Sequence, residues 1–257
     1  MLQADNISYK VGDKYLVKDV SIGIEPGTLH LIIGANGAGK STLIKLLSGQ
    51  LPPSSGLVSY AGKRANSYSF AEIARFRAVL SQSIEFSFPM KVNEVVMMGR
   101  FPHFAGAPKT KDIAACADAM EYFNVTEMAG RDYATLSGGE KQRVHFARVL
   151  AQIWYPADEG YRYLFLDEPL TFLDVHYQHQ FMQCLKDLLK AKDLVVAGVV
   201  HDLNLASKFA DKVTVLNEGG IFASGDPPAI LTAKNLEFIF KTETDVVIHK
   251  GKSFIIF

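Results

Sequence analysis

The chain has 257 residues, which is enough for one large α/β domain with a small insertion and too few for two such domains in tandem. Its 27 basic side chains balance 27 acidic ones, so the overall charge gives no signal for nucleic acid or for an anionic membrane surface. Two widely separated cysteines, Cys116 and Cys184, exclude a disulfide framework and a CxxC metal site, and they favour a reducing compartment.

The N-terminus lacks the basic-then-apolar pattern of a signal peptide. No uninterrupted apolar stretch approaches the roughly 20 residues that span a bilayer. We therefore expect a cytosolic chain that serves any membrane from one side.

The first third of the chain predicts short strands and one helix. An apolar run at residues 16–24 is followed by a turn and then by a strand at residues 29–33. A glycine-rich loop leads into a helix from about Lys40 to Ser48, and another strand is expected at residues 78–81.

The middle of the chain, residues 83–159, predicts helices, because apolar residues recur at helical spacing without a strong β pattern. We interpret it as a helical subdomain inserted into a single domain whose core comprises residues 1–82 and 160–257. The clearest helical spacing is that of Ile113, Cys116, Ala117 and Met120.

The last part of the chain returns to strands, expected at residues 163–166, 194–200 and 213–216, with a helix at 178–189. Runs that are buried on both sides and joined by helices indicate a mostly parallel sheet, so the predicted fold class is α/β. After Gly219 we expect a small hairpin, a helix near residues 228–240 and closing strands.

The glycine-rich loop after residue 33 matches a P-loop in sequence and in its place between a strand and a helix. Its glycines permit the tight curvature that turns successive backbone N–H groups toward one anion. Lys40 supplies a cation for the β- and γ-phosphates, and the Ser41 hydroxyl can ligate Mg²⁺. The loop therefore predicts a nucleoside triphosphate with its metal. The residues expected to bind it are Gly34, Ala35, Asn36, Gly37, Ala38, Gly39, Lys40, Ser41 and Thr42.

Two carboxylates, Asp167 and Glu168, follow the strand at residues 163–166. They lie at the carboxyl edge of the predicted sheet, where open α/β folds bind their ligands. We assign Asp167 to the magnesium shell, and Glu168 as the general base for a water aligned on the γ-phosphate. Alone, such a pair would as often be a solvated turn, but the P-loop upstream favours the catalytic interpretation.

The most specific string in the chain is LSGGE at residues 136–140, followed by KQR. Two glycines at a helix start let the backbone approach an anion, Ser137 adds a hydroxyl, and the helix dipole favours negative charge. The string resembles the signature motif of ABC ATPases. That resemblance implies an ATPase that uses ATP and Mg²⁺, with an N-terminal antiparallel β part beside the parallel sheet. It also implies a head-to-tail pair of chains, in which Ser137, Gly138 and Gly139 close over the P-loop of the second copy.

Other positions of the ABC pattern follow in order. Gln82 resembles the Q-loop glutamine, Asp174 belongs to a D-loop, and His201 resembles the switch histidine. The resemblance implies catalytic roles for Gln82 and His201, a place for Gln82 in the metal shell, and contact of Asp174 with the nucleotide. The position that usually stacks a ring on adenine falls on Val11, which has no ring, and either Tyr9 or Tyr15 could substitute.

The stretch from Phe86 to His103 resembles the importer branch for iron chelates, haem and corrinoids, and most of all bacterial haemin import ATPases. The insertion WYPADEG at residues 154–160 resembles the same proteins. The stretch is rich in Phe, Met and Pro, which suits a docking surface for a cytoplasmic permease loop. His103 is not expected to bind haem, and His176 and His179 are interpreted as a solvated or interface face rather than a metal site.

These resemblances imply a peripheral subunit at the cytoplasmic face of the bacterial inner membrane. Its partners would be a second copy of itself, a permease dimer and, indirectly, a periplasmic haem-binding protein, with no nucleic acid and no direct cargo contact. A ferric siderophore or corrinoid importer is the alternative cargo assignment. A soluble ABC ATPase of assembly or repair is a less favoured class.

Overall fold

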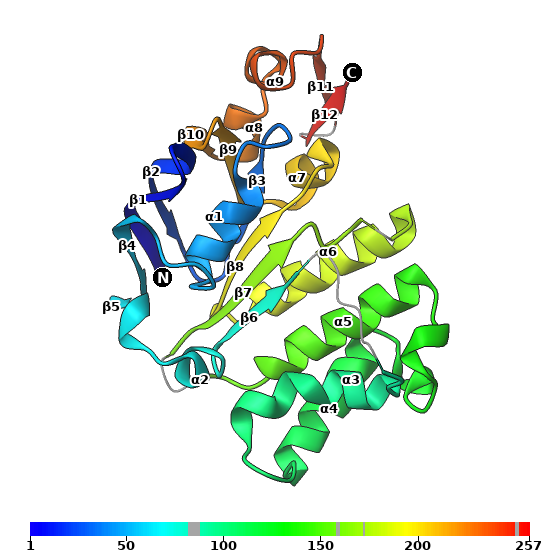
Figure 1. Cartoon of the computed structure of the whole chain (residues 1–257). Coiled ribbons are helices and arrows are strands. Elements are labelled where there is room, and N and C mark those ends of the chain that lie inside the picture. The colour runs from blue at the N-terminus through cyan, green and yellow to red at the C-terminus, as the bar shows by residue number, and fades with distance from the viewer. Residues whose placement is uncertain (82–87, 158–159, 172, 250–251) are drawn as a thin grey trace.

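The computed structural model describes residues 1–257 apart from 82–87, 158–159, 172 and 250–251. The described residues form an N-terminal antiparallel sheet, a central sheet, a helical region and a C-terminal tail (Figure 1).

The N-terminal sheet is antiparallel and orders its strands β2-β1-β4-β5. Gly12 joins the first two strands at a φ of 58°, a conformation that glycine adopts without a steric cost. The side chains of Ile7 and Val17 point into the core and are fully buried. The strands are β1 (Leu2–Val11), β2 (Lys14–Ile24), β4 (Ser55–Tyr60) and β5 (Lys63–Arg64).

The central sheet orders its strands β10-β9-β3-β8-β7-β6. Neighbours from β9 to β6 are parallel, and only β10 runs antiparallel to β9. The predicted mostly parallel sheet is confirmed, and the predicted strand ends differ from the observed ones by at most one residue. The strands are β3 (Leu29–Ile33), β6 (Arg77–Leu80), β7 (Arg162–Asp167), β8 (Leu194–Val199), β9 (Lys212–Asn217) and β10 (Gly220–Gly225).

Strand β7 shows how the sheet separates two apolar cores. Leu164 and Leu166 face the core that contains helices α5 (Gly138–Gln152) and α6 (Val175–Leu189). Tyr163 and Phe165 face the other core, with helix α1 (Lys40–Leu47) and the N-terminal sheet. Alternate side chains of a strand point to opposite faces, and burying each of these large side chains contributes about 1.5–3 kcal/mol. Helix α1 therefore lies on one face of the sheet, and α5 and α6 lie on the other (Figure 1).

The region between β6 and β7 is helical, as predicted. Of the four residues whose spacing predicted a helix here, Cys116 and Met120 are buried in α4, whereas Ile113 is 55% exposed and Ala117 is also exposed. Asp112 is buried instead, since its Oδ1 accepts a hydrogen bond from Arg100 Nε at 3.0 Å. The ion pair with Arg100 turns Asp112 toward the interior, so the buried face of α4 includes Asp112 in place of Ile113. The elements are α3 (Val92–Met97), η2 (Met98–His103), α4 (Thr110–Tyr122), η3 (Thr126–Met128), η4 (Tyr133–Thr135) and α5.

The tail differs from the prediction in one respect. The single helix expected near residues 228–240 is two helices, because the Thr232 side chain accepts from the backbone N–H of Asn235 and caps a new helix. Among the described residues, no helix combines the length and the apolar character that crossing a membrane requires. The remaining elements are η1 (Ala65–Ser67), α2 (Phe70–Ile73), α7 (Leu203–Phe209), α8 (Pro227–Ile230), α9 (Ala233–Phe240), β11 (Asp245–His249) and β12 (Lys252–Ile256).

Candidate active site

The P-loop joins the carboxyl end of β3 to the start of α1. Gly34 and Gly39 have φ values of 151° and 98°, and a Cβ at either would lie 2.2 Å from a backbone oxygen, that of Leu216 and of Leu16 respectively. Only glycine fits these two positions, which hold the loop against β9 and β2. Gly39 is also the N-cap of α1, so the first N–H groups of that helix face the loop.

Lys40 points back into the loop that precedes it. Its Nζ donates to the carbonyls of Gly34 and Ala35 at 2.9 and 3.0 Å. Burial lowers the pKa of Lys40, while the nearby carboxylates of Glu168 and Asp167 act in the opposite direction. The ammonium is thus held at the centre of the loop.

The other predicted P-loop residues divide by exposure. Asn36 and Gly37 form the exposed tip of the loop, and Ala38 is buried in the core with α1. Thr42, in the first turn of α1, is half-buried.

Ser41 and Asp167 meet although they are 126 residues apart in the chain. Ser41 Oγ donates to Asp167 Oδ1 at 2.9 Å. Burial raises the pKa of Asp167, the neighbouring Glu168 raises it further, and the hydrogen bond from Ser41 lowers it. A hydroxyl and a carboxylate are the hard oxygen donors that Mg²⁺ prefers, so the pair fits that ion.

Glu168 occupies a strained position just after β7. Its φ is 51°, a left-handed conformation that costs a non-glycine residue on the order of 1–3 kcal/mol. His201 Nε2 lies 2.7 Å from Glu168 Oε1, because β7 and β8 are parallel neighbours and both residues follow the carboxyl ends of these strands. The structure therefore brings together the carboxylate and the histidine that the sequence singled out.

The signature motif forms the start of α5. Ser137 is the N-cap: its Oγ accepts from the N–H of Glu140, and its own N–H donates to Glu140 Oε2 at 2.7 Å. Ser137 and Gly138 are exposed and Gly139 is half-buried, so this helix start is open to solvent.

Helix α5 runs antiparallel to the strands of the sheet. Near its start, Gln142 Nε2 donates to the carbonyl of Pro169, just past β7, at 2.6 Å. Near its end, Gln152 Nε2 donates to the carbonyls of Ala74 and Arg77, at the amino end of β6. The signature and the P-loop thus lie at the same edge of the sheet but on opposite faces. Gln142 stands inside the KQR string, but no signal in the sequence indicates this contact.

Asp174 caps α6, with its Oδ1 accepting from the N–H of Tyr177 at 3.0 Å. Val11, at the expected adenine position, is 55% exposed at the end of β1. Tyr9 packs in part against the core with α1, whereas Tyr15 is 46% exposed and precedes Leu16, which contacts the P-loop.

Several predicted positions lie outside the described residues or outside this site. Gln82, Phe86 and the last two acidic residues of the insertion are outside the described residues. His103 Nε2 donates to the carbonyl of Gln152 at 2.7 Å. His179 Nδ1 accepts from Lys208 Nζ at 3.0 Å. In the described part of the chain, no group of three or more metal-ligating side chains gathers.

Comparison with known proteins places this geometry in a family. The family model for ABC transporters matches residues 17–171. Hemin import ATP-binding protein HmuV of Bordetella avium (strain 197N) is 42% identical over 96% of this chain and 95% of its own length. The protein of the same name from Gloeobacter violaceus is 41% identical over 97% of this chain and 90% of its own.

Solved structures of ABC proteins share the fold. An inward-facing transporter described as metal-chelate type has a TM-score of 0.82 and 26% identity, covering 99% of this chain and 95% of that chain. A dimeric bacterial ABC transporter cassette has a TM-score of 0.76 and 25% identity, covering 88% and 99%. Since the family match covers more than half of the chain and the relatives match almost all of it, the chain belongs to the ABC transporter family.

Proposed function

We propose that this chain is the ATP-hydrolysing subunit of a bacterial haemin importer. The ATPase activity is supported above all by one observation: the P-loop, the Ser41–Asp167 pair and the Glu168–His201 pair lie together at one edge of the sheet. The haemin part is supported by relatives that are about two-fifths identical over nearly their full length and are named hemin import proteins. A ferric siderophore or a corrinoid stays as the alternative cargo.

The P-loop residues would hold the triphosphate, with backbone N–H groups and Lys40 Nζ facing its oxygens. Lys40 would exchange its present carbonyl partners for phosphate oxygens, which carry more negative charge. Ser41 and Asp167 would ligate Mg²⁺, which supplies charge neutralisation between the phosphates. Gln82 is proposed for the same metal shell and for catalysis from the sequence alone. We propose Tyr15 as the adenine contact, because it is the exposed candidate next to the P-loop.

Glu168 would accept the proton of the attacking water as general base. His201 would hold the Glu168 carboxylate in place through the 2.7 Å contact. The strained backbone of Glu168 is consistent with a residue fixed for a chemical role.

The second half of the site would come from a second copy of the chain. Ser137, Gly138 and Gly139 lie across the sheet from Lys40 of the same chain, so one chain cannot place both motifs on one γ-phosphate. An exposed helix start with two glycines suits an anion presented from outside. A head-to-tail dimer would give each nucleotide a P-loop from one copy and a signature from the other, with Asp174 at the contact.

We further propose the division into a core of residues 1–82 and 160–257 and a helical subdomain of residues 83–159, whose boundaries fall at residues outside the described part. The chain would sit peripherally on the cytoplasmic face of the inner membrane. A permease dimer would bind the region that includes residues 88–103, and a periplasmic haem-binding protein would act through that permease.

The test is ATP-dependent haem accumulation in proteoliposomes that contain this chain, its own permease and a haem-loaded binding protein. Glu168→Gln serves as the blank. We expect haem uptake to exceed that of a ferric siderophore and of a corrinoid under the same conditions. Uptake of either of these without haem would refute the haemin assignment and leave the ATPase mechanism in place.

A further inference from the structure

A cavity of about 410 Å³, outside the nucleotide site, lies at the seam between the core and the helical region. One wall comes from α2 and the turn after it, and another from η2 and the start of α4. The third comes from the chain that follows α5. The side chains that matter here are Arg75, Arg100, His103, Lys109, Lys111 and Tyr155.

Arg100 forms the base of this seam pocket and is only 3% exposed. Its Nε donates to Asp112, and its Nη1 donates to the carbonyls of Ala151 and Gln152 at 2.8 and 3.3 Å. Within the described part of the chain, Arg100 Nη2 has no hydrogen-bond partner. A guanidinium nitrogen with free N–H donors at a pocket wall is suited to an anion, because a charge-assisted hydrogen bond to an oxyanion is stronger than one between neutral groups.

The acidic side chains of the pocket are already engaged. Asp112 accepts from Arg100 through Oδ1 and from the N–H of Lys109 through Oδ2 at 3.0 Å. Glu72 Oε2 accepts from the N–H and hydroxyl of Ser69, which caps α2.

Four cations and two carboxylates line the walls, which leaves a net charge of +2 (4 − 2). Arg75, Lys109 and Lys111 join Arg100 as the cationic side chains. The pocket therefore carries an excess of positive charge that its own carboxylates do not neutralise.

Two further side chains shape the walls. Burial, and next the charge of Arg100, lower the pKa of His103, so its ring is neutral near pH 7 and donates from Nε2 to Gln152. The Tyr155 ring lies 4.5 Å from Lys111 Nζ and orients that ammonium.

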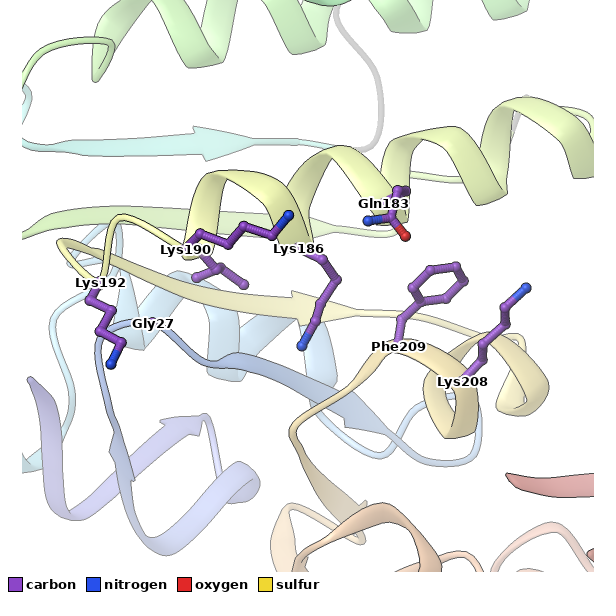
Figure 2. Close-up of a pocket in the computed structure, with 8 residues that line it drawn as sticks. Gly27, Gln183, Lys186, Lys190, Lys192, Lys208 and Phe209 are labelled. Carbon is purple, nitrogen blue, oxygen red and sulfur yellow. The ribbon is translucent and has the colours of Figure 1, made fainter. Parts of the chain in front are cut away.

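A second basic pocket provides a contrast. It has a volume of about 460 Å³ between α6 and α7 and is lined by lysines (Figure 2). Lys186 pairs with Asp211 at 2.6 Å, and Lys190 pairs with Asp187 at 2.7 Å. No charged side chain in its described lining is buried as deeply as Arg100. Among the residues that the structure describes, this lysine-lined pocket has the same number of cationic side chains as the seam pocket but no deeply buried one, so it serves as a control.

We propose that the seam pocket binds a carboxylate or phosphate group of a small anionic molecule, with Arg100 Nη2 at its base and Arg75 and Lys111 at its rim. Arg75 belongs to the core side, and its Nε already donates to the carbonyl of Pro102 across the seam at 3.2 Å. Lys111 belongs to α4 of the helical region. A bound anion therefore bridges the two parts of the chain and resists their relative movement. The volume lies within the range of small-molecule sites.

The test uses the purified chain with its P-loop filled by Mg²⁺ and ADP, so that the probe does not bind there. Citrate and inorganic phosphate are titrated by calorimetry at constant ionic strength, with chloride as the reference anion. We expect saturable binding, and a loss of about tenfold or more in affinity in the double variant Arg75→Gln, Lys111→Gln, since charge-assisted hydrogen bonds are removed. Both side chains are exposed, so the variant should fold. The control variant Lys190→Gln, Lys192→Gln should stay within about twofold of the wild type. Absence of saturable binding of both anions, or equal losses in the two double variants, overturns the proposal.

A second arm decides the source of the anionic group. Citrate is titrated into the chain assembled with its permease. Retained binding, with the same loss in the Arg75 and Lys111 variant, supports a free small molecule. Loss of citrate binding on assembly would show that a permease carboxylate fills the pocket, and would overturn the small-molecule proposal.

Discussion

Two glycines of the P-loop separate the cost of an unusual backbone conformation from the cost of close packing. Gly37 and Gly39 have φ values of 78° and 98°. Alanine at either position would therefore have to adopt a left-handed conformation, which costs about 1–2 kcal/mol. A Cβ at Gly37 meets nothing within 4 Å, whereas a Cβ at Gly39 lies 2.2 Å from the Leu16 oxygen. Only Gly39→Ala therefore forces the loop and β2 apart.

The size of that movement follows from the same distances. Ordinary contact begins at 3.4 Å, so the loop or β2 must shift by 1.2 Å (3.4 − 2.2). Leu16 precedes Val17, which is fully buried, and Gly39 caps α1 immediately before Lys40. We expect Gly37→Ala to cost about 1 kcal/mol of stability and Gly39→Ala about 3 kcal/mol or more. Displaced N–H groups should also lower ATP affinity in Gly39→Ala by about tenfold or more, which corresponds to 1.4 kcal/mol.

Urea unfolding of the wild type and both variants gives the two stability changes, and titration with a fluorescent ATP analogue gives the affinities. Gly37→Ala is the matched control, since Gly37 lies in the same loop as Gly39 and also has a positive φ. Equal losses of stability and affinity in the two variants would show that close packing against β2 does not shape the phosphate loop.

Three further predictions concern the site and the core. Glu168→Gln should lower turnover by about 100-fold or more while ATP binding persists, because the base is lost and its shape is kept; steady-state hydrolysis within about threefold of wild type would contradict this role. Chains carrying Ser137→Arg or Lys40→Ala should each be inactive alone, and mixing them should restore partial hydrolysis at one composite site; no recovery in dimers shown to form would count against the head-to-tail pair. Burial lowers the pKa of His30 from 6.5 to about 4, so the unfolded state binds more protons and stability falls by up to about 3 kcal/mol as the pH drops through this window. Urea unfolding at pH 7 and pH 4.5 should show a smaller drop for His30→Gln, and an equal drop would refute that assignment.

The sequence predicted the strands of the central sheet because strands buried on both faces read as continuous apolar runs. It also assigned Ser41 and Asp167 to one magnesium site, and the two side chains do meet, because the P-loop after β3 and the end of β7 lie at the same edge of the parallel sheet. It did not predict the buried Asp112, because a charged residue becomes an interior residue only through a partner that lies 12 positions away, Arg100. The left-handed backbone conformation of Glu168 was also not predicted, because nothing in the local sequence indicates that a glutamate will have a positive φ.

The contact between Gln142 and Pro169 was also beyond sequence reasoning, because it depends on how α5 lies across the end of β7. This contact is buried, and it ties the signature helix to the residue that follows Glu168. A shift of α5 therefore moves the backbone that positions the proposed base, while the P-loop on the opposite face is untouched.

We expect Gln142→Leu to lower turnover by about tenfold without changing the affinity of the single chain for ATP, since the buried Pro169 carbonyl loses the hydrogen bond from Gln142 at a cost of about 1–3 kcal/mol. Steady-state hydrolysis and nucleotide titration separate the two effects, and urea unfolding checks that the chain still folds. Gln142→Glu retains the length and an oxygen but no donor to the carbonyl, so it should share the defect. If both variants hydrolyse ATP at the wild-type rate, or if ATP affinity falls in step with turnover, Gln142 does not act by positioning Glu168.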